Sequence, residues 1–155
     1  MSPIKLVQDL YDLVGAENVS TDIDVIKNAG FPGLSLPEAV VFPGCKEEIC
    51  QVVSYANDYG IPIIPIGAGT NIRRVLSPAA GGIGISLKRM NRLLEFEPDN
   101  LSLVAEAGVT NEKLQRATEE FNLFLPVYPD YKESTIGGEV SAAAGSLCSA
   151  ALSSE

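Results

Sequence analysis

A glycine-rich turn, Gly67-Ala68-Gly69, follows directly on a short apolar run that is typical of a buried β-strand. Glycines tolerate positive φ, and successive backbone N–H groups in such a turn can converge on one anion. Thr70 and Asn71 add a hydroxyl and an amide that can donate to phosphate oxygens. The sequence therefore predicts a pyrophosphate-binding loop here, with an ordinary surface turn as the alternative. Its candidate residues are Pro65, Ile66, Gly67, Ala68, Gly69, Thr70 and Asn71.

Two common phosphate-binding motifs do not match this loop. The dinucleotide fingerprint GxGxxG would need a third glycine at position 72, which is Ile72, and it must open a helix. The segment from residue 73 to residue 82 has no helical periodicity. A Walker A loop is excluded because the GK[ST] sequence is missing.

A second glycine-bearing turn precedes an alanine-rich segment near the C-terminal end. Here Thr135-Ile136-Gly137-Gly138 stands at the start of a predicted helix, with Pro129 a few residues earlier. Unpaired N–H groups and the helix dipole favour an anion at a helix N-terminus. Capping of the helix by Ser134 or Thr135 is the alternative interpretation.

Composition limits the possible partners. The net charge is −9 without a cluster of Lys or Arg, so nucleic acid and anionic lipid surfaces are unfavourable partners. With no histidine and three cysteines without CxxC spacing, we expect reduced thiols and no metal site. We also expect no membrane span and a cytoplasmic location, because no apolar run approaches about 18 residues and no signal pattern opens the chain.

The hydrophobic pattern predicts an α+β fold, with a small parallel βαβ sheet flanked by helices, followed by a hairpin and helices that begin a second mixed sheet. Strands are expected at 39–42, 61–66 and 83–87, and a hairpin at 92–96 with 101–106. Helices are expected at 4–14, from Thr21 to Gly30, from Glu47 to Gly60, from Thr110 to Asn122 and from Thr135 onward. Residues 1–36 form an N-terminal helical segment in this interpretation, and residues 37–155 form the second region.

Specific positions in these helices are also predicted. Thr21 is expected to cap the second helix, with Ile23 and Ile26 buried. Cys45 occupies the cap position of the third helix. The apolar face of that third helix is predicted to consist of Ile49, Val52, Val53 and Ala56.

Six blocks follow one another along the chain: Pro37 to Pro43, the helix from Glu47, Ile63 to Asn71, Ile85 to Asn91, Ala105 to Thr110, and Thr135 to Gly138. Their order and spacing resemble the FAD-binding domain of FAD-linked oxidases of the vanillyl-alcohol oxidase and p-cresol methylhydroxylase type. Within this family the chain resembles the branch of glycolate oxidase and D-lactate dehydrogenase. The resemblance implies that residues 37–155 are the N-terminal part of such a domain.

The resemblance implies that the first loop and the turn at Thr135 together hold the FAD diphosphate. Some family members attach the flavin through a histidine where this chain has Thr70, so the resemblance implies non-covalent FAD here. It also implies a parent enzyme, an FAD-dependent dehydrogenase or oxidase, in which a 2-hydroxy acid such as glycolate or D-lactate reduces the flavin. Catalytic residues are unknown, because in this branch they lie mostly beyond residue 155.

Two departures from the family pattern concern the ligand. Bulky Ile72-Arg73-Arg74 stands where small residues and glycine are usual. Ala143-Ala144-Gly145-Ser146 stands where Asn-Ala-Gly-Gly is common, which removes an amide near the flavin.

Two other functions remain open from the sequence. One is a catalytically silent truncated or split module for flavin binding or assembly. Its unfinished sheet edge would pair with a partner subunit or a second copy of the chain. The other is the flavin subunit of a molybdenum hydroxylase, whose related domain also combines a glycine loop with a TIGG turn.

Overall fold

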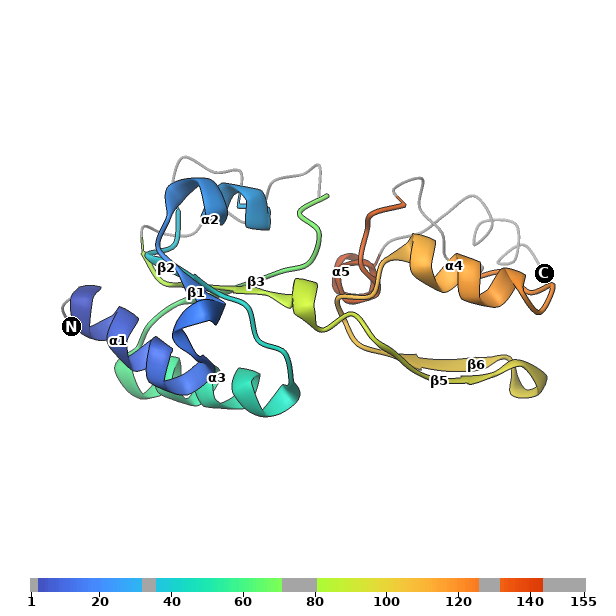
Figure 1. Cartoon of the computed structure of the whole chain (residues 1–155), viewed down its shortest axis with the longest axis horizontal. Helices are drawn as coiled ribbons and strands as arrows, with labels where there is room; N and C mark the ends of the chain where they lie inside the picture. The colour runs from blue at the N-terminus through green and yellow to red at the C-terminus, as the bar shows by residue number, and fades with distance from the viewer. Residues whose placement is uncertain (1–2, 32–35, 71–80, 126–131, 144–155) are drawn as a thin grey trace. The chain divides into compact units, whose positions relative to one another are not determined.

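The computed structural model describes residues 3–31, 36–70, 81–125 and 132–143 (Figure 1). The chain forms two compact units, Met1–Arg89 and Met90–Glu155. No helix in these described ranges combines the length and apolar character needed to cross a membrane.

The first unit contains a four-stranded sheet in the order β1-β2-β4-β3. Strands β2 (Ala39–Val41), β3 (Ile63–Ile66) and β4 (Ile83–Ser86) are parallel, and the short β1 (Val19–Ser20) is antiparallel to β2. The predicted parallel crossover from β2 to β3 is confirmed. Strand β4 lies between the two, a position that the sequence did not predict.

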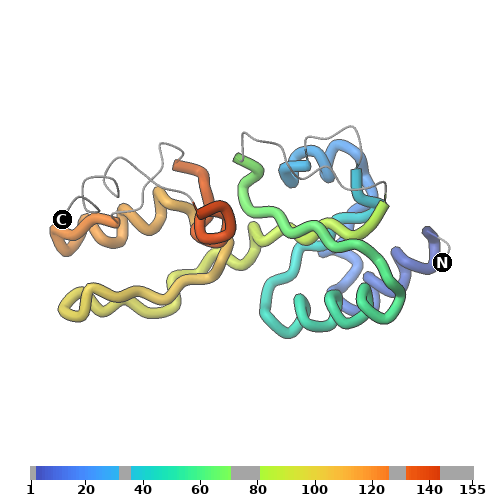
Figure 2. Tube along the Cα trace, turned by 180° about the vertical axis from the view of Figure 1, so that it is seen from behind, coloured from blue at the N-terminus to red at the C-terminus, as the bar shows by residue number. Residues whose placement is uncertain are grey.

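Helices cover both faces of this sheet (Figures 1 and 2). Helices α1 (Pro3–Val14) and α3 (Lys46–Tyr59) pack on the face that carries Ile83 and Ile85. Helix α2 (Ile23–Ala29) packs on the opposite face, in a core with Phe31, Val40, Ile64 and Ile66. Each strand thus alternates its side chains between two cores, which explains why β2 is buried throughout.

Three predictions about these helices are wrong. Asp22, and not Thr21, caps α2, because its carboxylate accepts from the N–H groups of Asp24 and Val25 at 2.8 and 3.1 Å. Ile23, in the first turn of α2, is 58% exposed, while Ile26 is buried as predicted. Val53 of α3 is also exposed, whereas Val52 and Ala56 form the buried face.

The second unit begins with the predicted hairpin, β5 (Leu93–Glu97) paired with β6 (Ser102–Ala105) through the 3-10 turn η3 (Pro98–Asn100). Helix α4 (Asn111–Glu119) lies along the hairpin, where Phe121 meets Phe96 edge to face at a centroid distance of 5.1 Å (Figure 1). Thr110 caps α4 as predicted, although the helix ends at Glu119 instead of Asn122.

An ion pair closes the open end of the hairpin. Arg92 Nη2 lies 2.6 Å from Glu106 Oε1, and the Arg92 backbone N–H donates to Glu106 Oε2 at 2.7 Å. These hydrogen bonds from Arg92 hold the pKa of Glu106 below its usual value. The pair thereby joins the residue before β5 to the residue after β6, where the chain continues toward α4.

The last element among the described residues of this unit is the short helix α5 (Ile136–Ala142), which starts where the sequence predicts. Thr135 caps α5, and an isolated antiparallel bridge joins Thr135 to Thr110, the cap of α4. The first turns of α4 and α5 are consequently held beside each other.

Candidate functional site

The predicted phosphate loop lies at the carboxyl end of β3. Strands β2, β3 and β4 run parallel, so their carboxyl ends meet at one edge of the sheet. Ligands of open α/β sheets commonly bind at this edge. Gly67, Ala68, Gly69 and Thr70 lie there, and Asn71 falls outside the described residues.

The backbone N–H groups of Gly67, Ala68 and Gly69 have no acceptor among the hydrogen bonds that join described loops, turns and caps. Gly69 adopts a φ of 77°, whereas Gly67 has no positive φ, so only one of the two glycines uses the left-handed region. Three consecutive N–H donors in a turn with one positive φ are the elements from which an anion-binding nest is built. This geometry supports the chemistry that the sequence predicts for the loop.

Gly69 also has a structural role that the sequence did not indicate. Its backbone packs against Gly30, the C-terminal cap of α2, which has a φ of 112°. A Cβ on Gly69 would lie 2.8 Å from Gly30 Cα, and a Cβ on Gly30 would lie 3.0 Å from Gly69 Cα. Because neither position has room for a side chain, the end of α2 determines where the loop can lie.

Two cationic side chains at the same edge of the sheet donate hydrogen bonds to backbone carbonyls. They belong to the 3-10 turn η2 (Leu87–Arg89), which follows β4. Lys88 Nζ donates to Asn28 O at 2.7 Å, and Arg89 Nη1 donates to Phe42 O at 2.6 Å. Lys88 thereby binds the last turn of α2 and Arg89 binds the segment after β2, while the nest itself offers neutral backbone dipoles to an anion.

The N-terminus of α3 lies at this edge as well, but its own carboxylates occupy it. Glu48 Oε2 accepts from the Gly44 N–H at 2.7 Å. The pKa of Glu47 is lowered, first by a hydrogen bond from its own backbone N–H and then by one from Cys45. A phosphate would meet negative charge at this helix end, so the loop after β3 is the better anion site.

The turn at Thr135 differs from the expectation of unpaired amides. Ile136 N–H donates to Val109 O and Gly137 N–H to Ala107 O, both at 2.9 Å. Gly138 N–H donates to Thr135 Oγ1 at 3.4 Å, and Glu139 N–H donates to Thr135 O at 3.0 Å. The premise of unpaired N–H groups is therefore wrong for this turn, because the chain itself supplies their acceptors.

The two glycines of this turn have different surroundings. A Cβ on Gly137 would lie 2.7 Å from Ala107 Cβ and 2.8 Å from Ala107 O. Gly138 is exposed, and a Cβ there would meet only Thr135 Oγ1, at 3.1 Å. Gly137 is thus required for packing inside the unit, while Gly138 can approach a ligand.

Sequence reasoning also missed the buried polar pair Asn111 and Glu139. Asn111 is the first residue of α4, and Glu139 lies in the first turn of α5. Their side chains are joined by a hydrogen bond from Asn111 Nδ2 to Glu139 Oε1. A glutamate at the start of a helix ordinarily suggests only a favourable dipole interaction, so its burial had no signal in the sequence.

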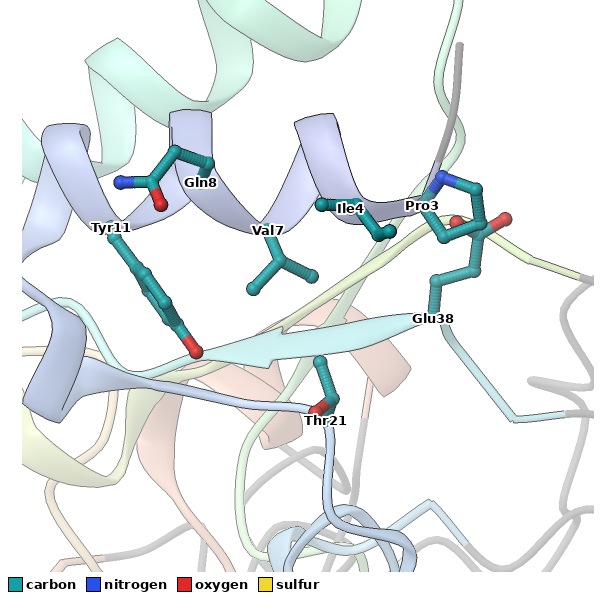
Figure 3. Close-up of a pocket in the computed structure, with 7 residues that line it drawn as sticks. All are labelled: Pro3, Ile4, Val7, Gln8, Tyr11, Thr21 and Glu38. Atoms are coloured by element: carbon teal, nitrogen blue, oxygen red, sulfur yellow. The ribbon is translucent and has the colours of Figure 1, made fainter.

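An apolar hollow of about 460 Å³ lies elsewhere in the first unit (Figure 3). It is formed beneath α1 by Pro3, Ile4, Val7, Gln8, Tyr11, Thr21 and Glu38. Glu38 precedes β2, so this part of the hollow lies at the amino end of the strand, away from the edge that carries the nest. The hollow is therefore separate from the candidate phosphate site.

Comparison with known proteins identifies the family. Residues 37–153 match the family described as FAD binding domain. The chain is 36% identical over 114 residues to glycolate oxidase subunit GlcD of Bacillus subtilis, covering 73% of this chain and 24% of that protein. It is 30% identical over 152 residues to D-2-hydroxyglutarate dehydrogenase of Stutzerimonas stutzeri, covering 95% of this chain and 33% of that one.

A solved structure gives the same result. The 4-ethylphenol oxidase of Gulosibacter chungangensis matches with a TM-score of 0.77 at 26% identity, over 88% of this chain and 28% of that one. The chain thus belongs to the FAD-binding domain family of the FAD-linked oxidoreductases, which confirms the predicted family, fold and cofactor. It spans between about a quarter and a third of the length of these three proteins.

Proposed function

We propose that this chain is the FAD-binding portion of a flavin-dependent oxidoreductase that acts on a 2-hydroxy acid, and that it binds FAD non-covalently. The observation that carries the proposal is the set of three consecutive N–H groups at Gly67, Ala68 and Gly69, which have no acceptor among the described loop contacts. Such a nest fits the charge of a diphosphate in a chain whose net charge is −9. The names of the two relatives support a 2-hydroxy acid as the substrate class.

The proposed binding residues fall into two groups. In the first group, Pro65 to Asn71, the backbone N–H groups of Gly67, Ala68 and Gly69 donate to the diphosphate, together with the Thr70 hydroxyl. Pro129 and the turn Thr135, Ile136, Gly137 and Gly138 form the second group. Because the amides of that turn have acceptors within the chain, its proposed contribution is close contact through the exposed Gly138.

FAD, when bound, would supply the acceptor for a hydride from the substrate carbon. The residues of this chain bind and orient the cofactor in this proposal. The catalytic residues, the substrate and the cytoplasmic location remain predictions for the whole protein. So does the division into residues 1–36 and 37–155.

One observation favours an additional role in assembly. Leu94, Leu101 and Val104 of the hairpin are 53%, 75% and 48% exposed, and the hairpin sheet has only two strands among the described residues. An exposed apolar hairpin with free edges can pair with a further strand. A partner subunit or a second copy of this chain is the proposed occupant of that edge.

The cofactor proposal predicts a difference between FAD and riboflavin. Riboflavin has the same ring system but no phosphate, so it cannot use the nest. We expect FAD to bind at least tenfold more tightly than riboflavin in a titration followed by flavin fluorescence, a difference of roughly 1.4 kcal/mol. Denaturation is expected to release all the bound flavin, because the chain has no histidine for a histidyl link.

Equal affinity for the two flavins would contradict a diphosphate nest. Flavin fluorescence that stays with the denatured polypeptide would contradict non-covalent binding. A protein that binds neither flavin would leave the assembly role as the better description of the isolated chain.

A further inference from the structure

Two polar side chains of the second unit are buried against each other. Asn111 is fully buried and Glu139 is 5% exposed. Asn111 Nδ2 donates to Glu139 Oε1, but the other two oxygens, Asn111 Oδ1 and Glu139 Oε2, are buried and have no hydrogen-bond partner among the described residues. Leaving buried polar atoms unpaired costs free energy, so this pair calls for a further donor.

A single proton can supply that donor. An ionised carboxylate only accepts hydrogen bonds, so neither unpaired oxygen could bond to the other. A protonated carboxyl group has one O–H donor. We propose that Glu139 is held as a neutral carboxylic acid that donates from Oε2 to Asn111 Oδ1 while Oε1 accepts from Asn111 Nδ2. This acid–amide pair satisfies both unpaired oxygens at once.

The surroundings of Glu139 favour its neutral form. Burial raises the pKa of Glu139, and the hydrogen bond from Asn111 opposes this only in part. Among the described residues, none of the charged groups on the neighbouring elements forms an ion pair with it. These groups are Glu112 and Lys113 on α4, Lys132 and Glu133 in the turn before α5, and Glu106 at the hairpin.

The pair has a positioning role. It joins the first turn of α4 to the first turn of α5, next to the bridge between Thr110 and Thr135. It thereby fixes the turn from Thr135 to Gly138, and the neutral state keeps a negative charge away from that turn. The pairing itself is independent of the proposed function, whereas its benefit for diphosphate binding rests on that function.

The pairing predicts a specific dependence of stability on pH. Because the pKa of Glu139 is raised in the folded state, its contribution is complete below the usual value of 4.5. That contribution is lost as the pH rises through the raised value. The variant Glu139→Gln carries a permanent amide donor in place of the O–H, so it should keep both hydrogen bonds at every pH.

The test is urea unfolding of the 155-residue chain without FAD, followed by circular dichroism between about pH 4 and about pH 8. We expect Glu139→Gln to be as stable as the parent at low pH, more stable at high pH, and less dependent on pH. Glu139→Ala, the control, is expected to lower the folding equilibrium constant roughly tenfold or more at low pH, since it leaves Asn111 unpaired. Infrared spectra of the parent at a pH above the usual value of 4.5 should show a protonated carboxyl band that Glu139→Gln lacks.

Parallel pH curves for the parent and Glu139→Gln would overturn the proposal. So would a Glu139→Gln variant as unstable as Glu139→Ala, or the absence of the carboxyl band. All of these readouts work without flavin, so failure of this inference is distinguishable from failure to bind FAD. If FAD binds, its affinity for Glu139→Gln should equal or exceed that for the parent at pH 8.

Discussion

Gly69→Ala is expected to lower FAD affinity by at least tenfold and to destabilise the first unit by about 2 to 4 kcal/mol. Two costs add at this position. Alanine disfavours the φ of 77°, and its Cβ would lie 2.8 Å from Gly30 Cα, where backbone has little freedom to move. The nest would have to shift away from α2, which changes the direction of its three N–H groups. Flavin fluorescence titration and urea unfolding measure the two effects.

Gly60→Ala is the matched control for this variant. Gly60 ends α3 with a φ of 63°, but a Cβ there would meet no atom of the described residues within 4 Å. It should therefore cost about 1 to 2 kcal/mol from the backbone conformation alone, without any loss of FAD affinity. If Gly69→Ala behaved like Gly60→Ala in both measurements, the contact between the nest and α2 would have no energetic importance.

Gly137→Ala is expected to destabilise the second unit by about 2 to 4 kcal/mol. The added methyl would lie 2.7 Å from Ala107 Cβ and 2.8 Å from Ala107 O. Relief of this clash would also break the hydrogen bond from Gly137 N–H to Ala107 O. Urea unfolding is the appropriate measurement because the expected loss of stability does not depend on a bound ligand.

Gly138→Ala provides the contrast within the same turn. Alanine is the better helix former and Gly138 is exposed, so the stability of this variant should stay within about 1 kcal/mol of the parent. We expect it to weaken FAD binding severalfold, because its methyl group would stand where the ligand approaches. An unchanged FAD affinity would remove Gly138 from the proposed site, and equal destabilisation by both substitutions would contradict their different surroundings.

Much of the fold was predictable because its signals are local. Apolar runs ending in Pro43-Gly44 and in Gly67 indicate buried strands, and these runs form β2 and β3. Thr110 and Thr135 have hydroxyls that cap helices, and both do so. The cap of α2 was harder to predict, because Thr21 and Asp22 are adjacent and both residue types can cap a helix. Only the fold selects Asp22.

The features that were missed depend on contacts between distant segments. The position of β4 between β2 and β3 follows from packing of the complete sheet, which no local pattern encodes. The contact of Gly30 with Gly69 and the burial of Glu139 against Asn111 are of the same kind. The turn at Thr135 was predicted as a helix start, yet two of its amides, those of Ile136 and Gly137, donate to Val109 and Ala107 in a distant loop.

The central claim is that the amides of Gly67, Ala68 and Gly69 bind the diphosphate of FAD. Nuclear magnetic resonance of the 15N-labelled chain tests it most directly, because each amide reports on its own hydrogen bond. Saturating FAD should shift these three resonances more than those of Ile136 and Gly137, and riboflavin should leave them unchanged. Bound FAD without a shift at Gly67, Ala68 and Gly69 would contradict the account.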